Sequence, residues 1–528
     1  MTKKTSFAGI AGIVALATLI SKVFGLVREQ LIAAAFGVGP IVNAYAYAYV
    51  IPGFLLILLG GINGPFHSAL LSVLAKKDRQ SAGPLVETVT TLVSCCLLLV
   101  TIVLAIAAPL CIDLLAPGLT ETVREMAIQQ LRIMSPLALL AGLIGIGFGT
   151  LNAAEEYWLP SISPLFSSIT IVIGMVYLIW QLGESINAPE YLQLGSIVLA
   201  GGTLLGGILQ WLAQLFAQLK AGMGRFRLSF NWRVPGVTEV LKVMIPATFS
   251  SGALYINVYT DLFFASYLDG AAAAMRYANF IVLTPLGIIS NMILVPLLPR
   301  LSRLSAPESR EELKLRIRQG LILTALTMLP LTAIFVSLAL PIVQLIYQRY
   351  AFGVDASRLV APVLMVYGLG MFFYLGRDVL VRVFYALGDG ETPFRISLAN
   401  IFLNLVLDYV LVNLYGIPGI VLATVGVNIV SMMVFLLILD RRLSGLPLVS
   451  WGMTLLSLFA ATLGSGLIAW LTNQGLHSLL GVENFWLLLL TVIVSSLVSI
   501  GVFMAIASTL KLPELEMLTN TLLAKIKR

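Results

Sequence analysis

Three polar side chains recur at helical spacing near residue 400, inside an otherwise apolar stretch. Asn400, Asn404 and Asp408 are four residues apart, so a helix places them on one face. Hard cations prefer carboxylate and carbonyl oxygens as ligands. The spacing is therefore compatible with a cation site, and equally with hydrogen bonds to a neighbouring helix. Asp261 and Thr424, which lie in other apolar stretches, are candidates to close such a site.

A second group of residues places charge inside long apolar stretches. On insertion scales, an ionised side chain at the centre of a membrane helix costs about 2.5 kcal/mol or more, so each is a candidate functional residue. The alternatives are internal ion pairing and snorkelling near a helix end, which we expect for Arg132. Arginine forks match phosphate oxygens, so a cavity lined by Lys22 and Arg28 would attract a phosphate group. The candidates are Lys22, Arg28, Glu29, Arg276, Arg377, Asp378 and Arg382.

The composition indicates which elements must position these residues. Of 528 residues, 59% are apolar and 11% are charged, and the mean hydropathy is +0.98. A soluble protein carries charge on roughly a quarter of its residues, so this chain cannot cover a surface that faces water. Stretches of about 20 apolar residues, the length that crosses a bilayer, recur from Gly9 to Leu510. We therefore predict an all-α polytopic membrane protein with about fourteen transmembrane helices.

The connections between these stretches predict the topology, because cytoplasmic loops carry an excess of Lys and Arg. With the N-terminus inside, the even-numbered connections and the tail hold most of the basic residues, among them Lys76, Arg225, Arg310 and Arg441. The net charge of +7 therefore follows from topology, and no nucleic-acid partner is needed to explain it. Both termini are expected in the cytoplasm. The predicted spans are 9–36, 41–74, 85–110, 126–153, 160–181, 192–219, 237–268, 271–303, 319–347, 357–388, 394–414, 417–439, 450–472 and 485–510.

The two ends of the chain and its few reactive side chains add little chemistry. The first apolar stretch is longer than the core of a signal peptide and contains charge, so we predict an uncleaved first helix. Residues 512–528 are expected to form a short amphipathic helix on anionic lipid or a solvated tail. Three cysteines and two histidines, all scattered, provide no zinc site and no Cys/His pair. Because no nucleophile–base pair or phosphate-binding glycine loop is visible, we do not expect an enzyme.

A long internal repeat predicts two related halves. Pro52 in AYVIPGFL and Pro285 in IVLTPLGI are 233 residues apart, and so are Pro160 in LNAAEEYWLPSI and Pro393 in FYALGDGETPFRI. An even number of predicted helices separates the copies, so both have the same orientation. Parallel repeats of this kind are typical of transporters that bind their substrate between the halves. We predict six-helix lobes over 1–235 and 236–445, an extra helix pair over 446–511 and a cytoplasmic tail over 512–528.

Three segments resemble the MurJ/MviN family of lipid II flippases, part of the multidrug/oligosaccharidyl-lipid/polysaccharide exporter superfamily. They are LISKVFGLVREQLIAAAFGVGPIVNAYAYAYVIP, FYALGDGETPFRI and GIPGIVLATVGVNIV. The resemblance covers nearly the whole chain and implies two six-helix lobes with a C-terminal pair that lines a groove for a polyprenyl tail. It also implies translocation of the peptidoglycan precursor across the bacterial cytoplasmic (inner) membrane by alternating access, and a role in cell wall biogenesis and cell shape.

The resemblance assigns roles to several of the residues above. Family arginines in the first helix match Lys22 and Arg28, with Glu29 beside them, and are expected to face the pyrophosphate of the substrate. The family's sodium site implies a bound sodium ion and no other cofactor. Its ligands match Asp261, Asn404 and Asp408, together with the carbonyl and hydroxyl groups of Ile420 and Thr424.

The chain also departs from the family pattern. The family commonly has an acid at the position of Asn43 and a basic residue near Leu58. A family arginine is replaced by Phe280, although Arg276 lies one helical turn away. A cavity with fewer charges is compatible with a different substrate headgroup.

Several functions therefore stay open beside a lipid II flippase that acts as a monomer. One is a flippase for another polyprenyl-linked glycan. Another is a cation-coupled multidrug exporter, although such an exporter should have a buried acid in its N-terminal cavity rather than Lys22 and Arg28. A membrane scaffold has no need of charged side chains in mid-membrane.

Overall fold

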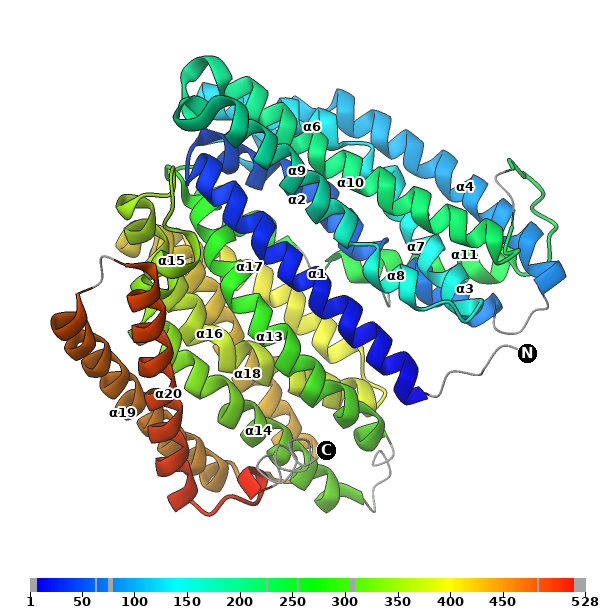
Figure 1. Ribbon diagram of the computed structural model, residues 1–528. Coiled ribbons are helices and arrows are strands. Elements are labelled where there is room, and N and C mark those ends of the chain that lie inside the picture. The colour runs from blue at the N-terminus through cyan, green and yellow to red at the C-terminus, as the bar shows by residue number, and fades with distance from the viewer. Residues whose placement is uncertain are drawn as a thin grey trace. The chain divides into compact units, whose positions relative to one another are not determined.

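The protein is built from helices (Figure 1), as the computed structural model shows. It describes residues 7–61, 64–74, 79–224, 227–253, 256–302, 309–481 and 484–516. Every regular element in these ranges is a helix, which confirms the predicted all-α fold class. A helix pairs its backbone groups within one segment, which is what a chain in lipid requires.

Packing divides the chain into two compact units. The first contains the described residues up to Ala273 together with Arg349–Phe352. In this unit α2 packs on α6, α9 on α10, and α7 on both α3 and α4. Its helices are α1 (Phe7–Phe36), α2 (Pro40–Leu58), α3 (Pro65–Leu74), α4 (Arg79–Ile106), α5 (Ala108–Leu115), α6 (Glu121–Met134), α7 (Leu137–Ala153), α8 (Trp158–Ile162), α9 (Leu165–Leu182), the 3-10 turns η1 (Gly183–Asn187) and η2 (Pro189–Tyr191), α10 (Leu192–Lys220), α11 (Val237–Ala253) and α12 (Ile256–Ala265).

The second unit contains the other described residues from Ala274 onwards. Here α16 packs between α14 and α18, α17 packs on α18, and α19 packs on α14 and α20. Its helices are α13 (Ala271–Ser302), which begins in the first unit, α14 (Arg310–Ser337), α15 (Ala339–Tyr347), α16 (Val354–Ala386), α17 (Glu391–Tyr415), α18 (Ile417–Arg442), α19 (Leu448–Leu480) and α20 (Phe485–Thr509).

By the criteria of length and hydropathy, fewer of the described helices qualify as membrane spans than the fourteen predicted. Among the described residues, 11 helices are long and apolar enough to cross a bilayer, or 12 if α6 and α7, bent by 40°, form one span. Two predicted spans stand outside this set. One is α1, which carries three ionisable side chains, and the other is α11 with α12, which are 17 and 10 residues long. The count of about fourteen is therefore not confirmed.

The division into units differs from the predicted lobe boundary between residues 235 and 236. Helices α11 and α12 belong to the first unit because α11 packs on α3 and α4 and α12 packs on α5. The pair α19 and α20 belongs to the second unit, where it packs on α14. The predicted lobes describe a repeat in the sequence rather than these packing contacts, and their boundaries stay predictions.

Backbone conformation follows the repeat of 233 residues. Gly37, Glu155 and Gly183 have positive φ angles of 58°, 65° and 50°. The residues at the same offset, Gly270, Gly388 and Gly416, have φ angles of 68°, 74° and 63°. Gly183 and Gly416 also share a ψ angle near −130° (−124° and −136°) at the ends of α9 and α17. The two halves therefore end corresponding helices with the same turns, as the predicted parallel repeat requires.

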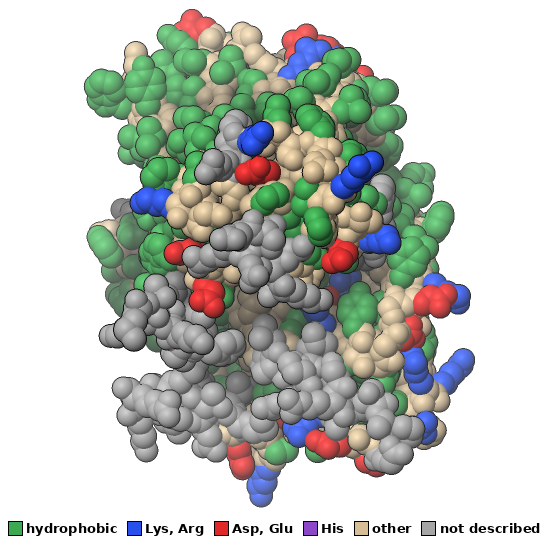
Figure 2. Space-filling view, turned by 90° about the vertical axis from the view of Figure 1, so that its right-hand side faces the viewer, with side chains coloured by type: hydrophobic (Ala, Val, Ile, Leu, Met, Phe, Trp, Pro, Cys, Tyr) green, Lys and Arg blue, Asp and Glu red, His purple; other side chains and the backbone are tan. Residues whose placement is uncertain are grey.

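The surface is suited to lipid. On the face shown in Figure 2, hydrophobic side chains cover broad areas, and acidic and basic side chains lie among one another between them. Many large apolar side chains are strongly exposed, such as Trp180 at 81%, Leu463 at 77% and Phe402 at 72%. Contiguous exposed apolar surface of this extent is unfavourable in water and favourable in a bilayer.

The start of the predicted tail is docked on the protein. Leu512, Glu514 and Leu515 are buried, and Arg318 Nη1 donates to Glu514 Oε1 at 2.6 Å. For Leu512–Glu516, neither a helix on the lipid surface nor a solvated tail is therefore correct. Residues 517–528 lie outside the described part of the chain.

Candidate functional site

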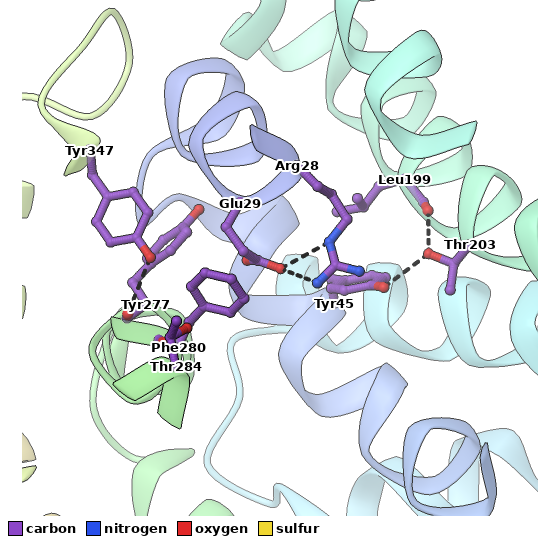
Figure 3. A network of polar contacts seen from close by, with 9 residues as sticks. All are labelled: Arg28, Glu29, Tyr45, Leu199, Thr203, Tyr277, Phe280, Thr284 and Tyr347. Atoms are coloured by element: carbon purple, nitrogen blue, oxygen red, sulfur yellow. Dashed lines mark hydrogen bonds and ion pairs between the residues drawn. The ribbon is translucent and has the colours of Figure 1, made fainter. Parts of the chain in front are cut away.

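Helix α1 carries an ion pair between neighbouring residues. Arg28 Nη2 and Nε lie 2.7 Å and 3.1 Å from Glu29 Oε1 (Figure 3). The Glu29 side chain is 2% exposed, whereas that of Arg28 is 24% exposed. A buried carboxylate is tolerated when an ion pair compensates its charge. Glu29 therefore holds a guanidinium group that is still partly accessible.

Lys22 also lies on α1 and is partly buried. It precedes Arg28 by six residues, which corresponds to about 9 Å along a helix axis. Both side chains are long and flexible, so their charged groups can bind oxygens of one phosphate or of two neighbouring phosphates. A pyrophosphate-linked headgroup could span that distance.

Polar side chains also join other helices of the first unit. Tyr45 Oη on α2 is 2.9 Å from Thr203 Oγ1 on α10, and Thr203 donates to the carbonyl oxygen of Leu199 at 2.8 Å (Figure 3). Tyr45 also stacks on Tyr49 at a centroid distance of 5.5 Å. These bonds satisfy two buried hydroxyl groups, and we assign them to helix packing.

Arg276 lies on α13 and belongs to the second unit. It is partly buried beside Tyr277, whose ring lies 4.9 Å from the ring of Tyr347. Tyr347 Oη donates to the carbonyl oxygen of Tyr277 at 3.3 Å (Figure 3). The predicted basic residues are thus divided between the units, with Lys22 and Arg28 in the first. A shared cavity stays a prediction.

Helix α16 places charge inside the second unit. Arg377 Nη2 donates to Asp378 Oδ1 at 3.0 Å, and Nη1 donates to Asn428 Oδ1 on α18 at 3.0 Å. The guanidinium group also lies 5.5 Å from the ring centroid of Tyr374. Arg382, slightly more than one turn further on, is partly buried. Arg377 and Asp378 therefore form an internal ion pair, and their contact with a substrate stays a prediction.

Helix α17 has a polar buried face and an apolar exposed face. Its buried residues are Pro393, Asn400, Asn404 and Asp408. Phe402, Val406 and Tyr409 on the other sides are 59% to 72% exposed. This reversed amphipathic pattern confirms that the three polar residues share one face, and it directs them towards α18, the helix on which α17 packs.

Two contacts define how α17 and α18 align. Ser431 Oγ donates to Asn400 Oδ1 at 3.0 Å, and Gly419 lies so close to the carbonyl oxygen of Leu411 that a Cβ atom would not fit. The helices are antiparallel and joined by Gly416 alone, so these contacts place Asp408 level with Thr424 and Asn404 level with Asn428. We call this set the α17–α18 ladder: Asn400, Asn404 and Asp408 with Thr424, Asn428 and Ser431.

The ladder gathers most of the predicted cation ligands. Asn404 Nδ2 donates to Asp408 Oδ2 at 2.8 Å, and both side chains are fully buried. Ile420 is buried one turn before Thr424 on α18. Asp261, on α12, belongs to the first unit. Within the described ranges no group of three His, Cys, Asp or Glu residues could hold a metal ion, so any cation here would depend on amide, hydroxyl and carbonyl oxygens.

Sequence reasoning did not single out Asn428 and Ser431. The signal was present, because Thr424, Asn428 and Ser431 follow the spacing i, i+4, i+7 on one helical face. Only the structure shows that this face meets the polar face of α17.

Comparisons with known proteins agree with this fold. Residues 32–508 match the family described as "Lipid II flippase MurJ". A protein of Synechocystis sp. described as "Probable lipid II flippase MurJ" is 62% identical over 523 residues, which is 99% of this chain and 98% of the relative. The "Lipid II flippase MurJ" of Burkholderia cenocepacia is 28% identical over 79% of this chain and 81% of its own.

The chain belongs to the MurJ family.

Solved structures give the same fold. A MurJ structure titled "Lipid II flippase MurJ, inward closed conformation" has a TM-score of 0.75 at 22% identity, over 94% of this chain and 98% of its own. An inward-facing transporter of the multidrug resistance MATE family in the MOP superfamily has a TM-score of 0.59 at 16% identity, over 82% and 98%. These structures show that the chain has the fold of a transporter superfamily. Its apolar helices and its membership of the MurJ family make it a multi-pass protein of the inner membrane.

The departures from the MurJ pattern have local explanations. Asn43, in place of an acid, accepts a hydrogen bond from the Ala273 backbone N–H at 3.4 Å, in the first turn of α13. An amide oxygen can make this contact as a carboxylate would. Leu58, in place of a basic residue, is 6% exposed and packs in an apolar cluster with Leu59 and Phe66. Neither position adds charge to a substrate cavity here.

Proposed function

We propose that this chain translocates lipid II from the inner to the outer leaflet of the cytoplasmic membrane by alternating access. Family membership supports this, since the relatives described above carry the name of lipid II flippases. The proposal includes a monomeric transporter with both termini in the cytoplasm.

The observation that carries the proposal is the partly exposed guanidinium of Arg28 on α1, the first of the predicted spans. Glu29 positions it, and a quarter of the arginine side chain stays accessible. A diphosphate offers several oxygens to the N–H groups of a guanidinium, and this pairing is stronger where water is excluded. Lys22, Arg276, Arg377, Asp378 and Arg382 are proposed as further contacts for the headgroup.

The α17–α18 ladder is proposed to bind sodium. Its carboxylate, amide and hydroxyl oxygens fit a hard cation. The proposed ligands are Asp261, Asn404, Asp408, Ile420 through its carbonyl group and Thr424. A cation can bias the transport cycle only by binding one conformation better than another.

Rescue of a bacterium depleted of its own lipid II flippase tests the transport proposal. We expect the wild-type chain to restore survival and lipid II in the outer leaflet. Arg28→Ala should lower the rescued translocation by at least tenfold, since it removes a charge-assisted contact of about 1.5–3 kcal/mol. Phe402→Ala, on the lipid-facing side of α17, is the control and should rescue normally. Failure of a well-inserted wild-type chain would favour another polyprenyl-linked glycan as substrate.

The sodium proposal has its own measurement. The purified protein in detergent should gain thermal stability when sodium chloride replaces choline chloride. Asp408→Ala should abolish that gain, because it removes the only carboxylate of the ladder. Asp355→Ala, in the exposed first turn of α16, should retain it. An unchanged sodium response in Asp408→Ala contradicts the site.

A multidrug exporter is the second candidate, favoured by the structural likeness to MATE transporters. The basic residues on α1 argue against it because cationic drugs would be repelled. Efflux of a cationic dye by the wild-type chain, unaffected by Arg28→Ala, would support this alternative.

A further inference from the structure

Asn428 has a defined position between Arg377 and the backbone of α18. Its Oδ1 accepts from Arg377 Nη1 at 3.0 Å, and its Nδ2 donates to the carbonyl oxygen of Thr424 at 2.8 Å. An arginine can only donate and a carbonyl oxygen can only accept, so only one orientation of the amide satisfies both partners. Asn428 is 5% exposed, which leaves little freedom for another rotamer.

The bond to Thr424 acts on the helix itself. In a regular helix the carbonyl of residue 424 already accepts from the backbone N–H of residue 428. A second, side-chain bond to the same oxygen restrains the local geometry of the turn and commonly bends it. The turn from Thr424 to Asn428 is the part of α18 that lies level with Asp408 and Asn404. Its geometry therefore determines where the Thr424 hydroxyl group stands relative to Asp408.

The bond to Arg377 connects this turn to α16. Arg377 shares its guanidinium group between Asp378 on its own helix and Asn428 on α18. Its side chain is 28% exposed, so it can respond to an anion or to a change in its surroundings. Nε of Arg377 is buried without a hydrogen-bond partner, so the group is held through its two terminal nitrogens.

We propose that Asn428 is a positioning residue that links Arg377 to the cation ladder and presets the turn at Thr424. This rests on the proposed cation site. When Arg377 is withdrawn from Asn428, for example by a phosphate group, the amide loses its orienting partner and the turn relaxes. Linkage is reciprocal, so cation binding at the ladder then also changes how readily Arg377 leaves Asn428.

Sodium-dependent thermal stabilisation in detergent tests the inference, with choline chloride keeping the ionic strength constant. Asn428→Leu removes both bonds, and we expect the sodium concentration for half-maximal stabilisation to rise about threefold to tenfold, the effect of one lost hydrogen bond. Arg377→Met removes the donor of the other bond and should cause a similar rise. The double variant should be no worse than Asn428→Leu alone, because one link is broken only once.

Asn413 provides a matched control. On α17 its Nδ2 donates to the carbonyl oxygen of Tyr409 at 2.6 Å, the same i−4 arrangement, but its side chain is exposed. Asn413→Leu should leave the sodium response unchanged. If the wild-type protein responds to sodium and both Asn428→Leu and Arg377→Met respond at the same concentration, the inference is overturned and the cation site stands. If the wild-type protein shows no sodium response, the cation site and the inference fall together.

Discussion

Asp389 holds the junction between α16 and α17 with three hydrogen bonds. Its carboxylate accepts from the Thr392 N–H at 2.9 Å, from the Thr392 hydroxyl at 2.8 Å and from Arg442 Nη1 at 2.6 Å. Partial burial raises the pKa of this carboxyl, but the bonds to Thr392 and Arg442 outweigh it, so the pKa lies below its ordinary value. The same residues line a cavity of about 350 Å³ with Glu391 and Arg395.

Removal of this carboxylate should destabilise the second unit in a pH-dependent way. A depressed pKa contributes stability above the unfolded value of about 4, and that stability is lost as pH falls through the folded value. Asp389→Ala should therefore cost about 1–2 kcal/mol near neutral pH, as a lost helix cap does. Its melting temperature should approach that of the wild type as the pH falls below about 4. Melting curves of the wild-type protein and of Asp389→Ala across this pH range test the prediction. A difference in melting temperature that stays constant with pH would contradict the lowered pKa of Asp389.

Single residues were easier to predict than their partners. The cost of charge in lipid singled out Arg28, Glu29 and Arg377 from the sequence. The partner of Arg28 is its neighbour, which the sequence also shows. The partner of Arg377 on α18 lies 51 residues further along the chain and depends on how two helices align, and no local pattern contains that information.

At the scale of elements, the end of α1 is fitted to a loop from far along the chain. Ala351 N–H donates to the carbonyl oxygen of Ala34 at 3.1 Å, which satisfies one acceptor left free at the helix end. Gly37, with φ of 58°, follows the helix, and a Cβ atom there would lie 2.6 Å from the carbonyl oxygen of Ala351. Both its conformation and its lack of a side chain are therefore required.

Gly37→Ala should lower the melting temperature more than the same substitution at Gly388. Both residues have a positive φ, which costs an alanine about 1–2 kcal/mol. A Cβ atom at Gly388 meets nothing within 4 Å, and the corresponding residue of the other half, Glu155, carries a side chain at φ 65°. Only Gly37→Ala adds a steric clash with the loop. Equal losses in the two variants would show that the loop contact adds nothing to stability.

Element boundaries show where the sequence was informative. The predicted span 41–74 contains a Gly-Gly-Ile-Asn-Gly-Pro segment from Gly60 to Pro65, and the structure ends α2 before it and begins α3 at Pro65. Such a run is a recognisable break, so this division could have been predicted. The bend between α6 and α7 likewise falls at Pro136. By contrast, α11 and α12 join the first unit through packing that no sequence period reveals.

At the scale of the whole molecule, the repeat and the charge distribution were both visible in the sequence. The repeat is matched by turns of the same conformation in both halves, because each copy must reverse the chain at the same points. The positive charge in alternate connections predicts an orientation in the membrane. Packing and fold are compatible with either orientation, so this prediction needs a separate measurement.

Cysteine labelling in intact cells measures the orientation. Ser185, in the turn after α9, and Ser444, after α18, are both exposed and lie in connections predicted to face opposite sides. Cys95, Cys96 and Cys111 are first replaced by alanine, since all three are free thiols. With the N-terminus in the cytoplasm, a membrane-impermeant maleimide should label Ser185→Cys in intact cells and Ser444→Cys only after permeabilisation. Labelling in the reverse order would show that the topology is inverted. The connections rich in Lys and Arg would then face the periplasm, against the rule that such connections lie in the cytoplasm.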